Sequence, residues 1–285
     1  MAYSAWIPQV RSVLRVSSGA LALAGVTLLS SACFDRVSNA ELREALVELV
    51  ADGQVMAFEN EIVELTTSFT IGDGVAAVAE EIRAFVESQL PCSTVTVEGA
   101  HLELDFGELG DACEYNGHTF AGVIELDLTG DADSITVDHM FTGVTNGEVT
   151  LDGAKQVVWT TKSRAIATDY AWKTDERAVE GTSERVQTLL DPDAGVRGGI
   201  EINGARQWTG ESGDWELSID GVEIRWMDPI PQAGQYTLTI PRGNQLSLSF
   251  TRIDEDTIEA VIAVGARTRV FHVNSAGGVS DESAG

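Results

Sequence analysis

Apolar residues follow two different spacings along this chain, and the change falls near residue 91. Between residues 38 and 90 they recur every three or four positions, which is the spacing of one face of an α-helix. Residues 38–41 have the sequence Ser-Asn-Ala-Glu, a capping box that marks the start of a helix. Asp52-Gly53 and Gly72-Asp73-Gly74 interrupt the helical spacing. The segment therefore predicts three short helices, over residues 38–51, 54–69 and 75–90.

Beyond residue 91, apolar and polar residues alternate in short runs that are separated by turn residues, the pattern of half-buried strands. Pairs typical of two-residue hairpin loops recur at Asn116-Gly117, Asn146-Gly147, Asp152-Gly153, Asn203-Gly204 and Asp220-Gly221. No long helical pattern follows, so crossover helices are excluded and the sheet is expected to be antiparallel. The predicted fold is mainly β, of the α+β class. An N-terminal helical segment packs on an antiparallel β body, which is either two related sheets or one long curved sheet.

The last of these pairs predicts a hairpin residue by residue. If Asp220-Gly221 is a two-residue loop, Trp215 lies opposite Trp226 in the neighbouring strand. The apolar residues between them fall on the same face, since side chains alternate along a strand. We therefore expect the two indoles to be buried cross-strand neighbours on the core side of the sheet.

Two stretches of the β region are similar to each other, which predicts an internal duplication. Residues 94–106 and residues 237–250 both end in a Leu-x-Leu-x-Phe strand, with one residue inserted in the second stretch. The alternative is that any two β-hairpins look alike. With the duplication, the chain divides into a signal peptide, a helical segment, two β modules and a disordered tail, over residues 1–32, 33–90, 91–175, 176–273 and 274–285.

The N-terminal 32 residues have the polarity of an export signal. They contain no acidic residue, and Arg11 and Arg15 precede an apolar run over residues 16–29. That run is shorter than the roughly 20 residues of a membrane-spanning helix.

Leu-Leu-Ser-Ser-Ala before Cys33 resembles the lipobox of bacterial lipoproteins, whose cysteine is acylated and becomes the new N-terminus. It departs from the usual pattern at Ser30, and ordinary signal-peptidase cleavage stays an alternative.

These features predict an exported protein that is lipid-anchored in the bacterial envelope through Cys33, at the outer membrane, on its periplasmic or surface face. Acylation of Cys33 would leave Cys92 and Cys113 as a pair in an oxidising compartment, where a disulfide persists. The alternative is two buried free thiols. The chain has no CxxC pair and no Cys/His cluster, which argues against a structural zinc site.

The acidity of the chain restricts its partners. After residue 32 there are 16 Lys and Arg against 45 Asp and Glu, a net charge of −29. Such a chain repels phosphate backbones, so a nucleic-acid partner is not expected. It also repels anionic headgroups, so attachment to a membrane is expected to come from acyl chains and not from a polybasic face.

The search for catalytic chemistry yields no catalytic residue and no cofactor. The chain has no nucleophile elbow, no HExxH motif and no phosphate-binding glycine loop. Asp127, Asp131 and Asp133 lie close enough in sequence to surround a hard cation such as Ca²⁺, although a solvated acidic turn is the favoured explanation. Three tryptophans would form a binding surface for a sugar or a peptide if exposed, and sheet packing if buried: Trp159, Trp172 and Trp208.

One stretch of the β region resembles a known family. Residues 90–160 contain Cys92, then Leu102-Glu103-Leu104-Asp105-Phe106-Gly107, Cys113, Gly117, Gly122-Val123-Ile124, Phe141 and Gly153. This pattern is similar to one found in uncharacterised secreted lipoproteins of Gram-negative bacteria. The resemblance implies a secreted β-sheet module and supplies no activity.

The function that these observations favour is non-catalytic binding or scaffolding by an envelope or surface lipoprotein, with a protein or glycan as ligand. One alternative is a hydrolase acting on envelope polysaccharide or peptidoglycan, which would need a concave cleft with converging carboxylates. Another is a carrier of apolar ligands, which would need a large apolar cavity. A closed core with an exposed flat sheet or aromatic patch would favour binding.

Overall fold

A computed structural model describes residues 37–111, 113–115, 118–174, 177–224, 231–255, 257–274 and 279–282. The chain divides into two units, residues 1–35 and 36–285, and the described residues belong to the second. The predicted signal peptide and Cys33 lie outside the described residues. In the part that is described, no helix has the length and apolarity needed to cross a bilayer.

The helical segment forms two helices, α1 (Asn39–Thr66) and α2 (Val75–Gln89). The capping box is confirmed: Ser38 N donates to Glu41 Oε2 at 2.7 Å, and Glu41 N donates to Ser38 Oγ at 3.2 Å. The prediction of a break at Asp52-Gly53 is wrong, because α1 continues through it. A glycine inside a helix costs only about 1 kcal/mol, and Asp52 is buried beside Arg206, 2.9 Å away.

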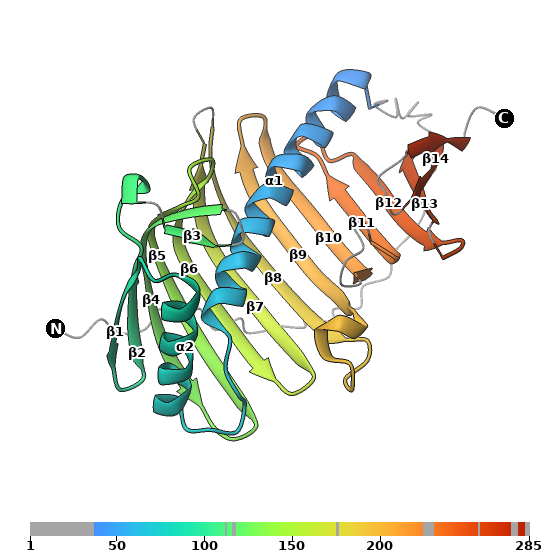
Figure 1. Ribbon diagram of the computed structural model, residues 1–285. Coiled ribbons are helices and arrows are strands. Elements are labelled where there is room, and N and C mark those ends of the chain that lie inside the picture. The colour runs from blue at the N-terminus through green and yellow to red at the C-terminus, as the bar shows by residue number, and fades with distance from the viewer. Residues whose placement is uncertain are drawn as a thin grey trace, which may run out of the picture. The chain divides into compact units, whose positions relative to one another are not determined.

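The rest of the chain forms one antiparallel meander in which each strand pairs with the next in sequence, except that β2 pairs with β4 and β3 is paired with β4 off the main path (Figure 1). This confirms the predicted class, a mainly antiparallel β protein with an N-terminal helical segment on the β body. The strands are β1 (Thr94–Glu98), β2 (His101–Asp105), β3 (Cys113–Tyr115), β4 (His118–Gly130), β5 (Ser134–Thr145), β6 (Thr150–Thr160), β7 (Ser163–Lys173), β8 (Ala178–Leu189), β9 (Ile200–Gly210), β10 (Gly213–Ile224), β11 (Ala233–Thr239), β12 (Gln245–Arg252), β13 (Thr257–Val264), β14 (Arg267–Asn274) and β15 (Val279–Asp281).

The sheet is continuous where the sequence predicts a boundary between two modules, at residues 175 and 176. β7 and β8 pair along their whole length, from Ser163 opposite Thr188 to Lys173 opposite Ala178. Of the two arrangements left open by the sequence, the structure has one long curved sheet. The two similar stretches form the β1–β2 and β11–β12 hairpins. The predicted disordered tail is wrong at β15, which pairs with β14, and most of its other residues lie outside the described part.

Three of the five Asx-Gly pairs lie inside long strands and not in hairpin loops. Gly153 is within β6, and a Cβ there would come within 2.3 Å of the Asp169 carbonyl oxygen of β7. Asp220-Gly221 is a bulge within β10, where Gly221 has a φ of 55° and the pairing register shifts. A glycine with positive φ therefore bends a strand here where the sequence predicts a turn. Asn203-Gly204 lies within β9, Asn146-Gly147 joins β5 to β6, and Asn116-Gly117 lies outside the described residues.

The bulge overturns the predicted partner of Trp215. Since β10 continues past Gly221, Trp215 lies opposite Trp208 of β9. The two indole rings are stacked with their centroids 6.3 Å apart, and both side chains are buried. Trp226 lies outside the described residues. Burial of Trp215 agrees with the sequence, and only its partner changes.

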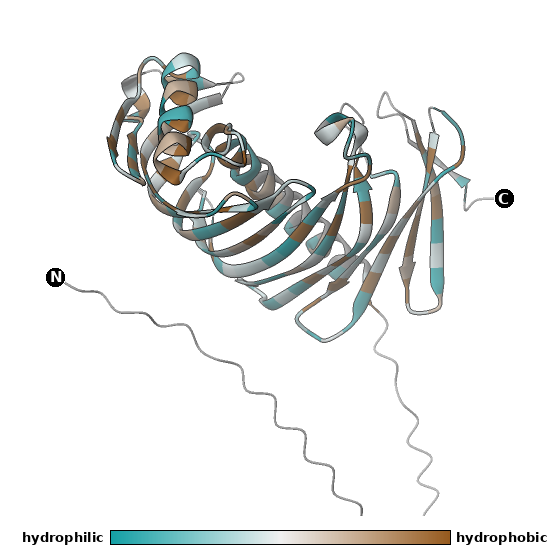
Figure 2. Cartoon of the chain, turned by 90° about the horizontal axis from the view of Figure 1, so that it is seen from below, coloured by the Kyte–Doolittle hydropathy of each residue, from teal (hydrophilic) through white to brown (hydrophobic). Residues whose placement is uncertain are grey.

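Both helices lie on one face of the sheet, which we call the inner face, and the sheet curves around them (Figures 1 and 2). α2 packs on β1, β2 and β4. α1 crosses the sheet diagonally. Near its start, Glu41 pairs with Arg242 at 3.0 Å and Glu44 accepts a hydrogen bond from Ser212 in the β9–β10 turn. Its last residue, Thr66, lies 2.8 Å from His139 of β5.

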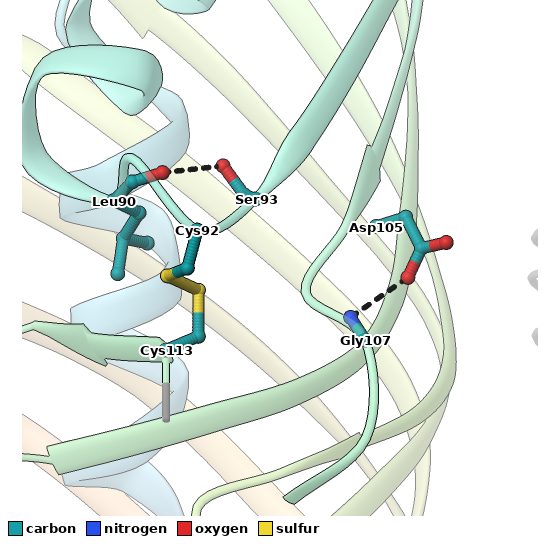
Figure 3. Close-up of a disulfide and its surroundings, with 6 residues drawn as sticks. All are labelled: Leu90, Cys92, Ser93, Asp105, Gly107 and Cys113. Carbon is teal, nitrogen blue, oxygen red and sulfur yellow. Dashed lines mark hydrogen bonds between the residues drawn. A yellow bond between two sulfur atoms is a disulfide. The ribbon is translucent and has the colours of Figure 1, made fainter. Parts of the chain in front are cut away.

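The predicted disulfide between Cys92 and Cys113 is confirmed (Figure 3). Cys92 follows α2, where Ser93 Oγ donates to the Leu90 carbonyl at 2.8 Å, and Cys113 begins β3. Their Cα atoms are 5.4 Å apart. The bond therefore fixes the end of α2 to the β3–β4 hairpin, at the part of the sheet that α2 covers.

Candidate functional site: the inner face of the sheet

Beneath α1 the inner face carries a cluster of buried charges. Glu59 of α1 is the centre: its Oε2 lies 3.0 Å from Lys155 Nζ and 3.4 Å from an Arg185 guanidinium nitrogen. Its other carboxylate oxygen lies 3.7 Å from Arg206, which also pairs with Asp52 at 2.9 Å. Strands β6, β8 and β9 supply the three cations. All five side chains are almost completely buried.

The spacing of residues along α1 explains why two carboxylates enter the sheet–helix interface. Asp52, Val55, Glu59, Ile62 and Thr66 are three or four residues apart, so they share one face of the helix. All five are buried against the sheet. The buried face of α1 therefore combines carboxylates with apolar side chains. Buried carboxylates need cations opposite them, because an unpaired buried charge is strongly unfavourable.

Burial and the neighbouring charges move the pKa values of this cluster in opposing directions. Burial alone raises the pKa of Glu59, but Lys155, Arg206 and Arg185 together lower it to about 2. Burial lowers the pKa of Lys155 to about 8, and its single carboxylate partner only partly opposes this because two guanidinium groups also repel its charge. At neutral pH, Glu59 is ionised and Lys155 is protonated. Glu59 and Lys155 therefore form a true ion pair, whereas burial raises the pKa of Asp52 although Arg206 opposes the rise.

Two further residues of α1 extend the same pattern towards its ends. Glu48 Oε2 accepts hydrogen bonds from Arg177 at 2.6 Å and from the Trp208 indole at 3.1 Å. His139, close to Thr66, is fully buried, and burial together with the positive charge of Lys155 lowers its pKa to about 3. His139 is therefore neutral at physiological pH. Polar and charged contacts thus follow α1 over most of its length.

This cluster has the properties of a structural clamp. Each carboxylate is held by cations from the sheet, and the groups are sealed between α1 and the strands. No substrate reaches them while α1 is in place. Among the described residues, no three His, Cys, Asp or Glu side chains are arranged to hold a metal ion.

The inner face of β11–β14 is different, because it is largely apolar and, apart from the buried Leu238, Leu246 and Ile258, only half-buried. Its orientation follows from the pairing register: Leu217 of β10 lies opposite Leu238, Leu238 opposite Leu246, and Leu246 opposite Val264. Cross-strand partners share a face, so this face continues the one that α1 covers. The start of α1 reaches its edge at the β11–β12 turn, through the Glu41–Arg242 pair, and among the described residues no helix lies over the rest of it (Figures 1 and 2). The apolar side chains that are half-buried there are Tyr236, Leu248, Phe250, Ala260, Ile262, Val264, Phe271 and Val273.

The outer face of the sheet has a shallow depression of about 660 Å³ across β4–β9. Alanines form part of its lining, and carboxylates surround them. Asp127 and Asp138 lie opposite each other in the β4–β5 register. Each is engaged by a neighbour: His101 contacts Asp127 at 2.9 Å, and Gln156 donates to Asp138 at 2.8 Å. This depression is the feature that the hydrolase alternative would use.

The structure does not assemble the predicted cation site. Asp127 projects from β4, whereas Asp131 is in the β4–β5 turn, where its carboxylate accepts hydrogen bonds from the backbone N–H groups of Asp133 and Ser134. That arrangement caps a turn. The acidic sequence is therefore explained by turn formation, which was the favoured explanation.

The predicted aromatic surface is not formed either. Trp172 and Trp208 are buried under α1, and Trp159 is half-buried against Phe69. All three point to the inner face, where an indole contributes a large apolar area to packing. Sequence patterns alone did not reveal the structural role of Lys155, Arg185 and Arg206. Each of these charged residues occupies a position in its strand where the alternation of side chains predicts a buried, inward-facing residue. That can be recognised only when the pairing register of the strands is known.

Comparison of the chain with protein-family models, with curated proteins and with solved structures gave no match. The resemblance of residues 90–160 to secreted lipoproteins stays an expectation drawn from the sequence.

Proposed function

We propose that this protein is a lipid-anchored envelope protein that binds, without catalysis, the acyl chain of a membrane lipid on the inner face of β11–β14. The observation that carries the proposal is the half-buried apolar face described above. A soluble protein normally covers such a face, and a contiguous apolar patch left partly exposed is typical of a binding surface. Of the roles weighed from the sequence, this combines the binding lipoprotein with the apolar-ligand carrier.

The dimensions of the face suit an acyl chain. Along β13 the half-buried inner positions run from Ala260 to Val264, four steps of about 3.4 Å each, which gives about 14 Å. One leaflet of a bilayer has a hydrocarbon depth of about 15 Å, half of the roughly 30 Å core. A single chain lying along the strand direction would therefore contact apolar side chains over its whole length.

The position of α1 connects the proposed anchor with this face. Ser38, the helix cap, is five residues after Cys33, and five extended residues span at most about 18 Å. The first turn of α1 contacts the β11–β12 turn through the Glu41–Arg242 pair. A lipid on Cys33 would thus hold this end of the sheet near the bilayer, which is the source of the proposed ligand.

Catalysis is less well supported by the geometry. The buried charges under α1 are sealed and paired, as shown by the 3.0 Å Glu59–Lys155 contact. The Asp127–Asp138 pair lies in an open depression on the outer face and not in a cleft that encloses a polymer. A glycosidase needs two carboxylates that flank one bond of an enclosed sugar.

A neutral apolar dye tests the binding surface. We expect N-phenyl-1-naphthylamine to bind the purified chain lacking residues 1–33, and Leu248→Gln to weaken binding at least about fivefold, since it places an amide on the apolar face. Ser249→Gln is the matched control, because Ser249 follows on the same strand and faces outward. Thermal melting checks that both variants are folded. Absence of dye binding, or equal weakening by both substitutions, would refute the proposal.

The anchor is tested separately in a bacterial host. Metabolic labelling with a fatty-acid analogue should tag the wild-type chain, and Cys33→Ala should abolish the label. An unlabelled wild-type chain would refute acylation of Cys33.

A further inference from the structure

The strong negative charge of this protein is confined to one part of the chain. Residues 37–224 contain 10 Lys and Arg against 37 Asp and Glu. Residues 231–274, which form β11–β14, contain four of each. The average charge of the whole chain therefore conceals a neutral region, and this region is the one with the open apolar face.

Two of the arginines in this region stand on the apolar face itself. In the β13–β14 register, Arg269 lies opposite Ile262 and Arg267 lies opposite Val264. Partners of this kind share a face, with Cβ atoms about 5 Å apart. Both arginines therefore project on the inner side of the sheet, directly beside the apolar row of β13, and both are exposed.

Both arginines lie near one end of the apolar face. Arg267 follows the β13–β14 turn, and Arg242 occupies the β11–β12 turn at the same end of the sheet, with 73% of its side chain exposed. Arg242 also pairs with Glu41 at 3.0 Å, so its charge is partly compensated. The opposite end of the apolar row on β13, at Ile258, is buried. The surface thus has an apolar length with a cationic end, the arrangement that suits an amphiphile with one charged end.

We infer that the ligand of this surface is an anionic membrane lipid, whose acyl chain lies on the inner face of β11–β14 and whose negatively charged headgroup contacts Arg267 and Arg269. The inference rests on the proposed function and adds the chemical class of the headgroup. Arginine presents several N–H donors in a plane, which favours phosphate and carboxylate oxygens. The inference also revises the expectation that the net charge would keep anionic headgroups away, because that repulsion belongs to residues 37–224.

The test compares two lysophospholipids with the same acyl chain, below their micelle concentrations, as competitors of the bound dye. Lysophosphatidylglycerol has a net negative charge, and lysophosphatidylcholine has none. We expect the wild-type chain without residues 1–33 to prefer lysophosphatidylglycerol by about three- to tenfold at roughly 0.15 M salt, where a Debye length of about 8 Å screens the distant carboxylates. Half-molar NaCl should reduce the preference, since exposed charges are screened over a few ångströms at such ionic strength.

The double variant Arg267→Ser/Arg269→Ser should bring the two affinities together while leaving lysophosphatidylcholine binding within about twofold. Arg197→Ser is the control, because Arg197 is exposed in the β8–β9 connection at the opposite end of the strands. It should preserve the preference. If both lysolipids bind wild type equally, or if the preference survives the double variant, the inference is overturned while the proposed function stands. If neither lysolipid displaces the dye, the proposed function itself fails.

Discussion

The part of the sheet beneath α1 and the part formed by β11–β14 differ in how completely they bury the side chains of the inner face. Under the helix, Lys155 and Arg206 have 2% and 0% of their surface exposed. On β12 and β13 the apolar side chains of Leu248 and Ile262 are only half-buried. On the inner face, even charged side chains are therefore fully buried beneath α1, whereas most apolar side chains of β12–β14 stay half-buried. Lys155 and Arg206 can be buried beneath α1 because Glu59 and Asp52 of α1 form ion pairs with them.

The two parts also differ in what a ligand would encounter. The covered part is already occupied, since α1 supplies both the apolar contacts and the counter-charges. The open part offers apolar area whose transfer from water is worth roughly 25 cal/mol per Å². One part of the inner face of the sheet is thus covered by α1. The inner face of β11–β14 is left largely without a helix. Four measurements test this difference between the two parts of the sheet.

The largest expected effect comes from Glu59→Gln. The substitution leaves Lys155, Arg185 and Arg206 buried with only Asp52 to balance them. Loss of one partner from a buried ion cluster costs about 3–5 kcal/mol of unfolding free energy. Urea denaturation at pH 7 measures it. The control is Glu64→Gln, whose half-exposed pair with Arg164 should be worth less than about 1 kcal/mol. Equal losses of unfolding free energy for the two substitutions would show that the buried ion cluster does not hold α1 on the sheet.

Removal of the disulfide should follow in size. The Cys92–Cys113 bond closes a loop of 21 residues, which corresponds to about 3 kcal/mol if the bond is unstrained. Replacing both cysteines with alanine should lower the unfolding free energy by that amount and increase hydrogen exchange in β1–β4, but not in β11–β14. Reductant should weaken the wild type and leave the double variant unchanged. Faster exchange throughout the sheet would mean that the two parts unfold as one unit.

Acid should weaken the covered part first. The pKa of His139 is lowered from 6.5 to about 3 in the folded protein, by burial and by Lys155. Its stabilising contribution is complete above pH 6.5 and is lost as the pH falls towards 3, with about 2 kcal/mol lost by pH 5. Glu59, whose pKa falls from 4.5 to about 2, adds to the loss only below pH 4.5.

Thermal melts between pH 7 and pH 5 measure this effect of His139. His139→Gln should flatten the decline in melting temperature, because glutamine does not titrate. The exposed His101, 2.9 Å from Asp127 on the outer face, serves as the control, and His101→Gln should leave the decline as it is. An unchanged slope in His139→Gln would exclude this residue as the cause.

The smallest loss of unfolding free energy is expected for a leucine on the inner face of β11–β14. Leu248→Ala should cost about 1 kcal/mol, since the side chain is only half-buried and little cavity remains. Leu104→Ala, at a fully buried position of β2, should cost about 2–5 kcal/mol. Denaturation curves of the two variants give the ratio directly. A cost above 2 kcal/mol for Leu248→Ala would indicate that this face is covered in solution.

Short-range features of this protein were determined by its sequence alone. The capping box at Ser38, the change of period near residue 91 and the antiparallel class all depend on residues that are neighbours in the chain. The Cys92–Cys113 pairing followed from cysteine counting under the assumption that Cys33 carries lipid. The burial of Trp215 followed from strand alternation, which does not depend on the identity of the partner strand.

Tertiary structure decided the rest, for two physical reasons. A glycine with positive φ serves a tight turn and a strand bulge equally well, so Asp220-Gly221 could not reveal that β10 continues through it. Contacts between residues far apart in the chain depend on strand order and register, which no local pattern encodes. Glu59 meets Lys155 across 96 residues only because α1 lies over β6. Arg267 and Arg269 stand beside the apolar row of β13 only because the register places them there.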